Sequence, residues 1–129
     1  MCLITKQSTW LVAKKDIKCY KMLEVKRFLF IKSYITPYRG MEVPKEVILG
    51  KKDLIAEGTA VFAPYYDGDI NYEINEGAIH AFSDFETALN YSISGCQIFE
   101  CIIPAGTKYA VSRGTGFICA EKIRFVKNV

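Results

Sequence analysis

The chain contains one histidine, His80, and this residue is the first whose type could support chemistry. It lies in the run Gly77–Phe82, just before a predicted helix, and imidazole is the side chain that changes its charge nearest neutral pH. Catalysis by a histidine also needs a nucleophile or an orienting carboxylate at a suitable spacing, and the sequence shows neither pattern. We therefore expect His80 to contact a ligand or to be structural, and the sequence identifies no catalytic residue.

A glycine-rich run near the C-terminus, Ser112–Gly116, is a candidate anion site. Its backbone N–H groups and the guanidinium of Arg113 could together hold a phosphate. The run lacks the lysine and the strand-to-helix context of a P-loop, so a plain connection between two strands is the alternative.

Metal ligands and disulfides have no clear signature. The run Asp67–Glu73 carries oxygen-bearing side chains at alternate positions, as calcium loops do, but Tyr72 and Ala78 stand where an EF-hand requires glycine and glutamate. We therefore interpret this run as a hairpin. The five cysteines form no C-x-x-C pair, so we expect buried, reduced thiols in a cytoplasmic protein that has no metal site and no cofactor.

Charge is segregated along the chain. Residues 1–52 carry a net charge of +8, residues 53–112 a net charge of −8, and residues 113–129 a net charge of +3. Such blocks can form a partner surface, or basic strands can pack beside acidic ones and neutralise them. Nucleic-acid binding would require the basic side chains of the first block to share one face. The candidates are Lys14, Lys15, Lys18, Lys21, Lys26 and Arg27.

Most of the chain has the apolar pattern of β-strands. The longest such runs, Ile17–Val25 and Phe28–Ile35, predict a hairpin. Glu24–Arg27 lies between them, and the pattern leaves the position of the turn open. In the second run, Leu29 and Ile31 belong to the alternating aliphatic face that we expect to point to the core.

One helix is predicted, at about residues 83–94. Ser83 and Glu86 form a capping box, apolar residues follow at helical spacing, and Gly95 ends the pattern. The expected fold class is α+β, with a mostly antiparallel, strongly curved sheet and one principal helix in a single domain, residues 1–129. No apolar run reaches the roughly 18 residues that a membrane span needs, so we expect no membrane contact.

The segment Tyr38-Arg39-Gly40 resembles the Y-R-G segment of mono-ADP-ribosyltransferases, whose arginine contacts the pyrophosphate of NAD. This resemblance implies a nucleotide-binding enzyme in which Arg39 is an anion ligand. The chain departs from that family elsewhere: Ala60–Tyr66 contains no serine for the family's S-T-S strand, and Glu73-Ile74-Asn75-Glu76 does not have the spacing of its catalytic glutamate motif.

Several segments together resemble a group of short, functionally uncharacterised proteins of bacterial and phage origin. The resemblance spans nearly the whole chain and implies a small intracellular α+β domain, with no activity attached. The matching segments are Met1-Cys2-Leu3, Cys19-Tyr20-Lys21, Thr36-Pro37-Tyr38-Arg39-Gly40, Gly77-Ala78-Ile79-His80-Ala81-Phe82, Cys101-Ile102-Ile103-Pro104-Ala105-Gly106-Thr107-Lys108-Tyr109 and Lys122-Ile123-Arg124-Phe125-Val126.

These observations lead to one main hypothesis about function and two alternatives. The main hypothesis is a small cytoplasmic binding or accessory protein without catalytic machinery, which contacts an unknown small ligand or protein partner. The first alternative is an enzyme of ADP-ribosyltransferase-like type that acts on a nucleotide or phosphate ligand, and the second is nucleic-acid binding through the basic N-terminal half. Aromatic and arginine side chains dominate binding surfaces. The residues expected at the ligand site are Tyr20, Tyr38, Arg39, His80 and Arg113.

Overall fold

The computed structural model of the chain describes residues 4–6, 11–36, 40–56, 61–67, 70–76, 78–112 and 116–129. This described part forms strands throughout, with two short helices. The strands are β1 (Ile4–Lys6), β2 (Leu11–Val12), β3 (Ile17–Phe28), β4 (Ile31–Ile35), β5 (Glu42–Val43), β6 (Leu54–Ile55), β7 (Val61–Asp67), β8 (Ile70–Glu76), β9 (Ile79–Phe82), β10 (Cys96–Ile103), β11 (Lys108–Ser112), β12 (Phe117–Ala120) and β13 (Lys122–Asn128). The helices are α1 (Lys45–Ile48) and α2 (Phe85–Asn90).

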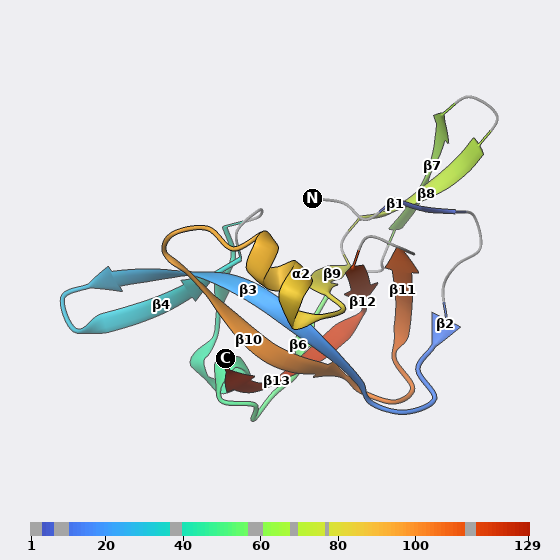
Figure 1. Cartoon of the computed structure of the whole chain (residues 1–129). Coiled ribbons are helices and arrows are strands. Elements are labelled where there is room, and N and C mark those ends of the chain that lie inside the picture. The colour runs from blue at the N-terminus through green and yellow to red at the C-terminus, as the bar shows by residue number, and fades with distance from the viewer. Residues whose placement is uncertain are drawn as a thin grey trace.

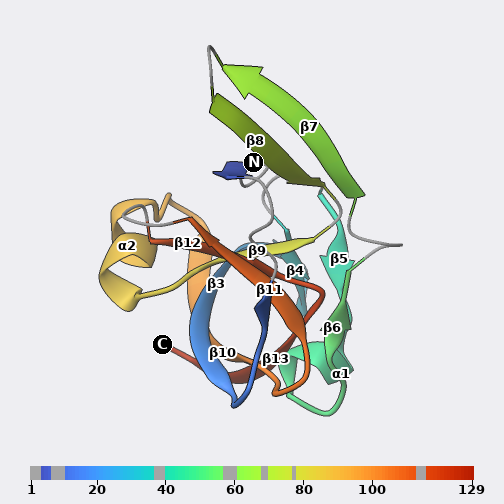
Figure 2. The same ribbon diagram turned by 90° about the vertical axis from the view of Figure 1, so that its right-hand side faces the viewer.

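Two antiparallel sheets organise these strands. The larger sheet has the order β2-β11-β12-β9-β3-β10-β13-β6, and β4 and β5 extend it from β3. The smaller sheet has the order β1-β8-β7 and stands at one end of the molecule (Figure 1). Seen from the side, the larger sheet curls strongly, with β3 and β10 on one side and β11 on the other (Figure 2).

The main core lies inside this curl. Along β3, Cys19 and Leu23 face inward and are fully buried, because alternate side chains of a strand point to the same face. Cys101 and Ile103 of β10 are also fully buried in this core, and Cys101 lies directly opposite Cys19 in the pairing of the two strands. The inward positions of β9, β12 and β13 complete the core, and α1 adds Val47.

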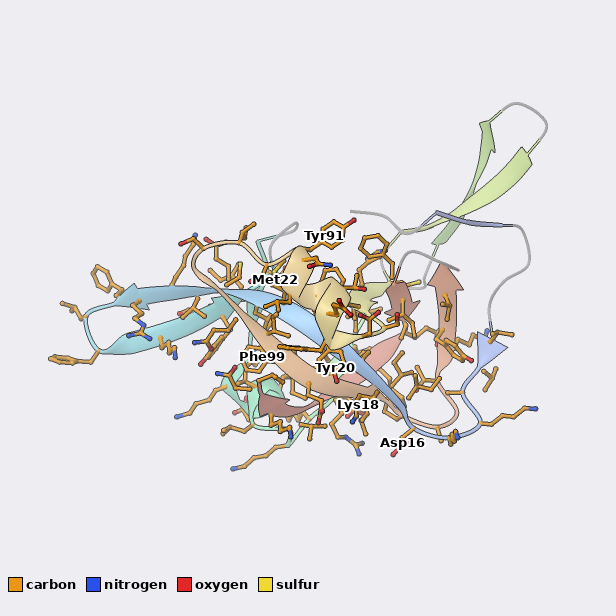
Figure 3. The ribbon with its side chains drawn as sticks, in the orientation of Figure 1. Asp16, Lys18, Tyr20, Met22, Tyr91 and Phe99 are labelled. Carbon is orange, nitrogen blue, oxygen red and sulfur yellow. The ribbon has the colours of Figure 1, made fainter. Side chains whose placement is uncertain are left out.

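Helix α2 packs on the opposite face of the sheet. A second cluster of buried residues, Phe82, Ala88 and Ile98, lies beneath it. Tyr20 and Met22 of β3 pack against that cluster, and Figure 3 shows both side chains near the helix. The sheet therefore buries side chains on both faces where α2 covers it.

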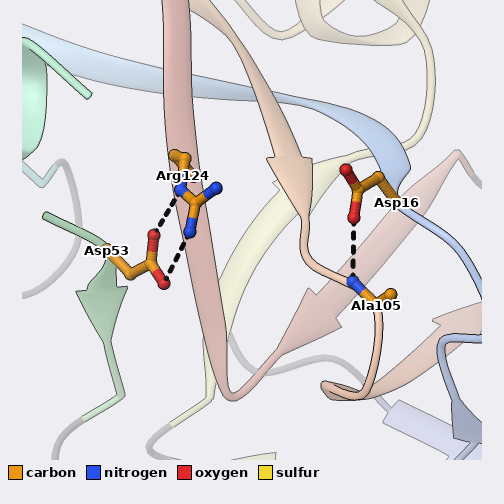
Figure 4. Close-up of polar contacts among 4 residues, drawn as sticks. All are labelled: Asp16, Asp53, Ala105 and Arg124. Carbon is orange, nitrogen blue, oxygen red and sulfur yellow. Dashed lines mark hydrogen bonds and ion pairs between the residues drawn. The ribbon is translucent and has the colours of Figure 1, made fainter. Parts of the chain in front are cut away.

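Polar contacts tie loops to the sheet edges and neutralise part of the segregated charge. Arg124 Nε on β13 donates to Asp53 Oδ1 at 2.8 Å, and the Ala105 N–H donates to Asp16 Oδ1 at 2.9 Å (Figure 4). Lys18 of β3 pairs with Glu100 of β10 at 3.6 Å. Pairing between basic and acidic strands, the alternative that the sequence left open, is thus observed at these positions.

The predicted α+β class is wrong, because the fold is nearly all-β. The helix predicted at about residues 83–94 spans only six residues, Phe85–Asn90, and cannot form a layer of its own. Its capping residue is Asp84 rather than Ser83: the Thr87 N–H donates to Asp84 Oδ1 at 2.7 Å, and the Thr87 hydroxyl donates to Asp84 Oδ2 at 2.9 Å. The short helix leaves the sheet itself to bury most of the apolar side chains. No helix among the described residues is long and apolar enough to cross a membrane.

Candidate functional site

Two of the five predicted ligand residues can be placed in the structure. Tyr38, Arg39 and Arg113 lie outside the described residues. Tyr20 pairs in register with Phe82, so its side chain shares a sheet face with His80, two residues before Phe82. The Tyr20 ring lies 5.8 Å from that of Phe85, between centroids, and packs beneath α2. Tyr20 and His80 thus share a face, but Tyr20 is engaged in packing.

His80 also marks the point where β3 and β9 diverge. The two strands share one register pair, Tyr20 with Phe82, and the ammonium of Lys21 donates to the backbone oxygen of His80 at 2.6 Å. Lys21 lies on the inward series of β3, and burial lowers its pKa from 10.5 to about 8. Its hydrogen bond supplies a link between β3 and β9 beyond their single register pair.

The cysteines near Lys21 do not resemble activated nucleophiles. Burial raises the pKa of Cys19 to about 12, and burial likewise raises the pKa of Cys101, although the Lys21 ammonium acts in the opposite direction on both thiols. A catalytic cysteine needs a lowered pKa and access to solvent. The pair is reduced, and we interpret Cys19 and Cys101 as packing residues of the core.

The motifs that suggested metal or anion binding join neighbouring strands. Asp67 pairs with Ile70 at the end of the β7–β8 hairpin, which confirms the hairpin interpretation of this run. Ser112 pairs with Phe117, so the Ser112–Gly116 run connects two adjacent antiparallel strands, and its residues 113–115 lie outside the described part. Within the residues that can be described, no group of three His, Cys, Asp or Glu side chains could hold a metal ion.

The basic residues of the first charge block do not share one face. Consecutive strand residues point to opposite faces, so Lys18 and Lys26 lie on one side of β3 while Lys21 and Arg27 lie on the other. Lys18 is paired with Glu100, and Lys21 bonds His80 as described above.

A feature that sequence reasoning missed is the end of the β3–β4 hairpin. We call residues Phe28–Ile31 the hairpin tip. Their exposed fractions are 75% for Phe28, 83% for Leu29, 103% for Phe30 and 67% for Ile31. Four consecutive large apolar side chains are therefore open to solvent at the end of a hairpin that projects from the body of the protein (Figure 1).

The hairpin has no support from neighbouring strands near its tip. The pairing of β3 with β10 ends at Glu24, and the pairing of β4 with β5 begins at Tyr34. The Val25 N–H still donates to the backbone oxygen of Gly95, at 2.8 Å. Residues 26–33 therefore form a two-stranded hairpin, which is marginally stable by itself in water. Its turn contains Leu29 at φ 56°, a left-handed conformation that favours glycine or asparagine over a bulky side chain.

Three basic residues surround the hairpin directly behind the tip. Lys26, Arg27 and Lys32, which we call the basic ring, are all exposed. Arg27 and Lys32 are register partners across the hairpin, and like charges in that position repel each other. Lys32 also lies over the Tyr34 ring, 5.5 Å from its centroid. In the described part of the chain, no acidic side chain pairs with any member of the ring.

The sequence pattern contained a signal for this site that was interpreted differently. Leu29 and Ile31 are predicted on the core face of a strand, but the structure turns at Leu29 and Phe30. The core-face prediction is wrong because these residues form the exposed end of the hairpin, and Leu-Phe is not a typical turn sequence. The signal in the sequence is a run of four apolar residues with a base on each side. Apolar side chains at the end of a projecting hairpin cannot reach the core.

Comparisons with known proteins give no relative: no family model, no curated protein and no solved structure matches the chain.

Proposed function

We propose that this protein is a small cytoplasmic binding module without catalytic machinery, and that the tip of the β3–β4 hairpin is its contact element. The observation that carries the proposal is the run of four exposed apolar side chains on an otherwise unsupported hairpin. Exposed apolar patches of this kind mark interaction sites, whereas scattered single residues do not.

Three features of the hairpin are unfavourable for the isolated protein. The apolar side chains meet water, Leu29 occupies a left-handed conformation, and Arg27 faces Lys32. Local features that oppose folding are typical of functional sites, where the free energy of binding offsets their cost. A partner that covers the tip and supplies negative charge would relieve the exposure and the repulsion together.

The remaining groups of the chain support a binding role over catalysis. The thiols of Cys19, Cys96 and Cys101 have raised pKa values, chiefly because of burial, and therefore lack the reactivity of nucleophiles. A reducing cytoplasm is consistent with the free thiols of these cysteines and of Cys119. The nucleic-acid alternative is less well supported, because Lys18 and Lys21 point to opposite faces.

Site-specific photocrosslinking tests the proposal. A photoreactive benzophenone amino acid replaces Phe30 in the full chain, and the matched control carries it at Ile55, which is 70% exposed but lies far from the tip in sequence and in the sheet. We expect reproducible crosslinks in living cells from position 30 and not from position 55, because only the tip meets a partner. Equal yields from the two positions, or no crosslink from position 30, would overturn the proposal.

A further inference from the structure

We propose that the partner of the hairpin tip is an anionic lipid surface, into which the tip inserts while the basic ring contacts the headgroups. This inference rests on the proposed function and names its partner class. It also departs from the expectation that the protein makes no membrane contact, which rested only on the lack of a long apolar run. A surface-inserted hairpin needs no spanning segment.

The hairpin tip is apolar on all sides. Phe28 and Ile31 are register partners, so their side chains share one face, while Leu29 and Phe30 form the turn beyond them. Each of the four side chains is at least two-thirds exposed. No side of the tip is therefore polar or packed against the rest of the protein. A groove on a protein partner would contact one face of the hairpin, whereas the acyl region of a bilayer contacts an inserted element on every side.

The bases of the ring also lie on both faces of the hairpin. Lys26 and Arg27 are consecutive in β3 and point to opposite faces, and Lys32 joins Arg27 across the hairpin. The ring therefore places bases on both faces of the hairpin behind the apolar residues, with Arg27 and Lys32 next to the tip and Lys26 one pair further back. Juxtamembrane bases attract anionic headgroups, and such contacts would also relieve the repulsion between Arg27 and Lys32.

The spacing between the apolar and the basic residues fits insertion at a membrane interface. The Arg27–Lys32 pair lies one residue behind the Phe28–Ile31 pair, a separation of about 3.3 Å along a strand. Interfacial elements bury their apolar side chains roughly 5–10 Å into the headgroup and acyl boundary. Long basic side chains extend their charge toward the headgroups while their stems stay among apolar groups. At a single depth of insertion, the apolar side chains of the tip can therefore lie among acyl chains while the charges of the basic ring reach the headgroups.

Vesicle flotation of the full-length protein tests the inference. The probes are vesicles of phosphatidylcholine alone and vesicles in which about 30% of the lipid is phosphatidylserine. We expect the protein to float with the anionic vesicles, and the bound fraction to fall as salt is raised, because the ring contributes by screened charge. Little binding is expected to phosphatidylcholine alone, since one weak anchor rarely holds a protein at a membrane.

Two variants separate the apolar and the basic contributions. The tip variant combines Phe28→Thr, Leu29→Asn, Phe30→Gly and Ile31→Thr, and the ring variant combines Lys26→Gln, Arg27→Gln and Lys32→Gln. Each is expected to lower the affinity for anionic vesicles at least about tenfold. Matched controls remove exposed side chains elsewhere: Leu49→Asn with Ile55→Thr for the tip, and Lys14→Gln with Lys15→Gln and Lys51→Gln for the ring. These controls are expected to bind within about twofold of the wild-type protein.

Several outcomes would overturn the inference. They are an absence of flotation, equal binding to both vesicle types, or an equal loss of binding in the control variants. A tip-dependent dimer that forms without lipid, or crosslinks from position 30 that reach only a protein, would also overturn it while leaving the proposed function intact. A lack of crosslinks from position 30 would instead remove the proposed function itself.

Discussion

Strand β3 carries apolar side chains along its whole length, but its two halves use them differently. In the first half, Cys19 and Leu23 are fully buried in the curl of the sheet and contact β10 and its neighbours. In the second half, beyond Glu24, β3 pairs only with β4 and ends in the exposed hairpin tip. The comparison teaches that apolar character alone does not define a core residue, because supporting neighbours decide whether a side chain is buried.

Among the changes that test this comparison, truncation of a buried leucine should lower the free energy of unfolding most. Leu23→Ala leaves a cavity in the core and should lower the free energy of unfolding by about 3 kcal/mol. Leu29→Ala removes the same atoms at the tip and should change it by less than about 0.5 kcal/mol. Urea denaturation of both variants measures the difference, and a similar loss in the two would remove the distinction between the halves.

Two turn residues, Gly50 beside the packed sheet and Leu29 at the hairpin tip, extend the comparison between packed and exposed regions. Gly50 has φ 76°, and a Cβ there would lie 2.7 Å from the backbone oxygen of Phe125. Gly50→Ala should therefore lower the free energy of unfolding by about 2 kcal/mol, since both the backbone conformation and the space require glycine. Thermal unfolding checks this result. A neutral effect would show that the sheet edge at β13 adapts easily, and the packed region would then be less rigid than we infer.

The corresponding change at the tip should act in the opposite direction. Leu29 has φ 56° without any packing that requires leucine, so Leu29→Gly should raise the free energy of unfolding by up to about 1 kcal/mol. The same variant should weaken any contact made by the tip. Paired measurements of denaturation and vesicle binding check both expectations, and a loss of stability would mean that the leucine side chain supports the fold.

The smallest effect is a pH dependence in the buried half. Burial lowers the pKa of Lys21 in the folded protein to about 8 from 10.5, so between these pH values the unfolded chain binds more protons and stability rises with pH. The buried thiols of Cys19 and Cys101 act oppositely from about pH 8 upward, because the unfolded chain loses their protons first. From pH 8 to pH 9 the Lys21 contribution alone amounts to up to about 1 kcal/mol, and the thiols offset part of it.

Lys21→Met provides the test of this assignment. The variant keeps the length of the side chain but has no titrating group, so its stability should rise less, or fall more, between pH 8 and pH 9 than that of the wild-type protein. Denaturation curves of both proteins at both pH values measure the difference. An identical pH dependence in the two proteins would mean that another group is responsible.

Much of the strand layout was predictable because it follows from local alternation. Strand β10 (Cys96–Ile103) shows this alternation, because Phe99, Cys101 and Ile103 are buried in the main core. The antiparallel character of the sheet was also predictable, since short strands follow one another through tight turns. The helix was overestimated because the apolar residues after Asp84 follow helical spacing for only six residues before Tyr91 ends the helix.

The candidate site was less predictable, because exposure depends on which strands pair. Sequence alone placed Lys21 among surface bases, although the alternation of Cys19, Lys21 and Leu23 already put it on the inward series. Tyr20 was expected to contact a ligand, but its position opposite Phe82 places it beneath α2. The hairpin tip became recognisable only when the limits of the β10 and β5 pairing were known.

The central claim is that the hairpin tip serves contact and contributes nothing to folding. The most direct test is equilibrium denaturation of the wild-type protein and of the tip variant defined above. We expect the tip variant to be at least as stable, because asparagine tolerates the left-handed conformation of position 29 better than leucine and the four replaced side chains are at least two-thirds exposed. A decrease of more than about 1.5 kcal/mol in the free energy of unfolding would contradict the account, since a loss of that size requires buried contacts at the tip.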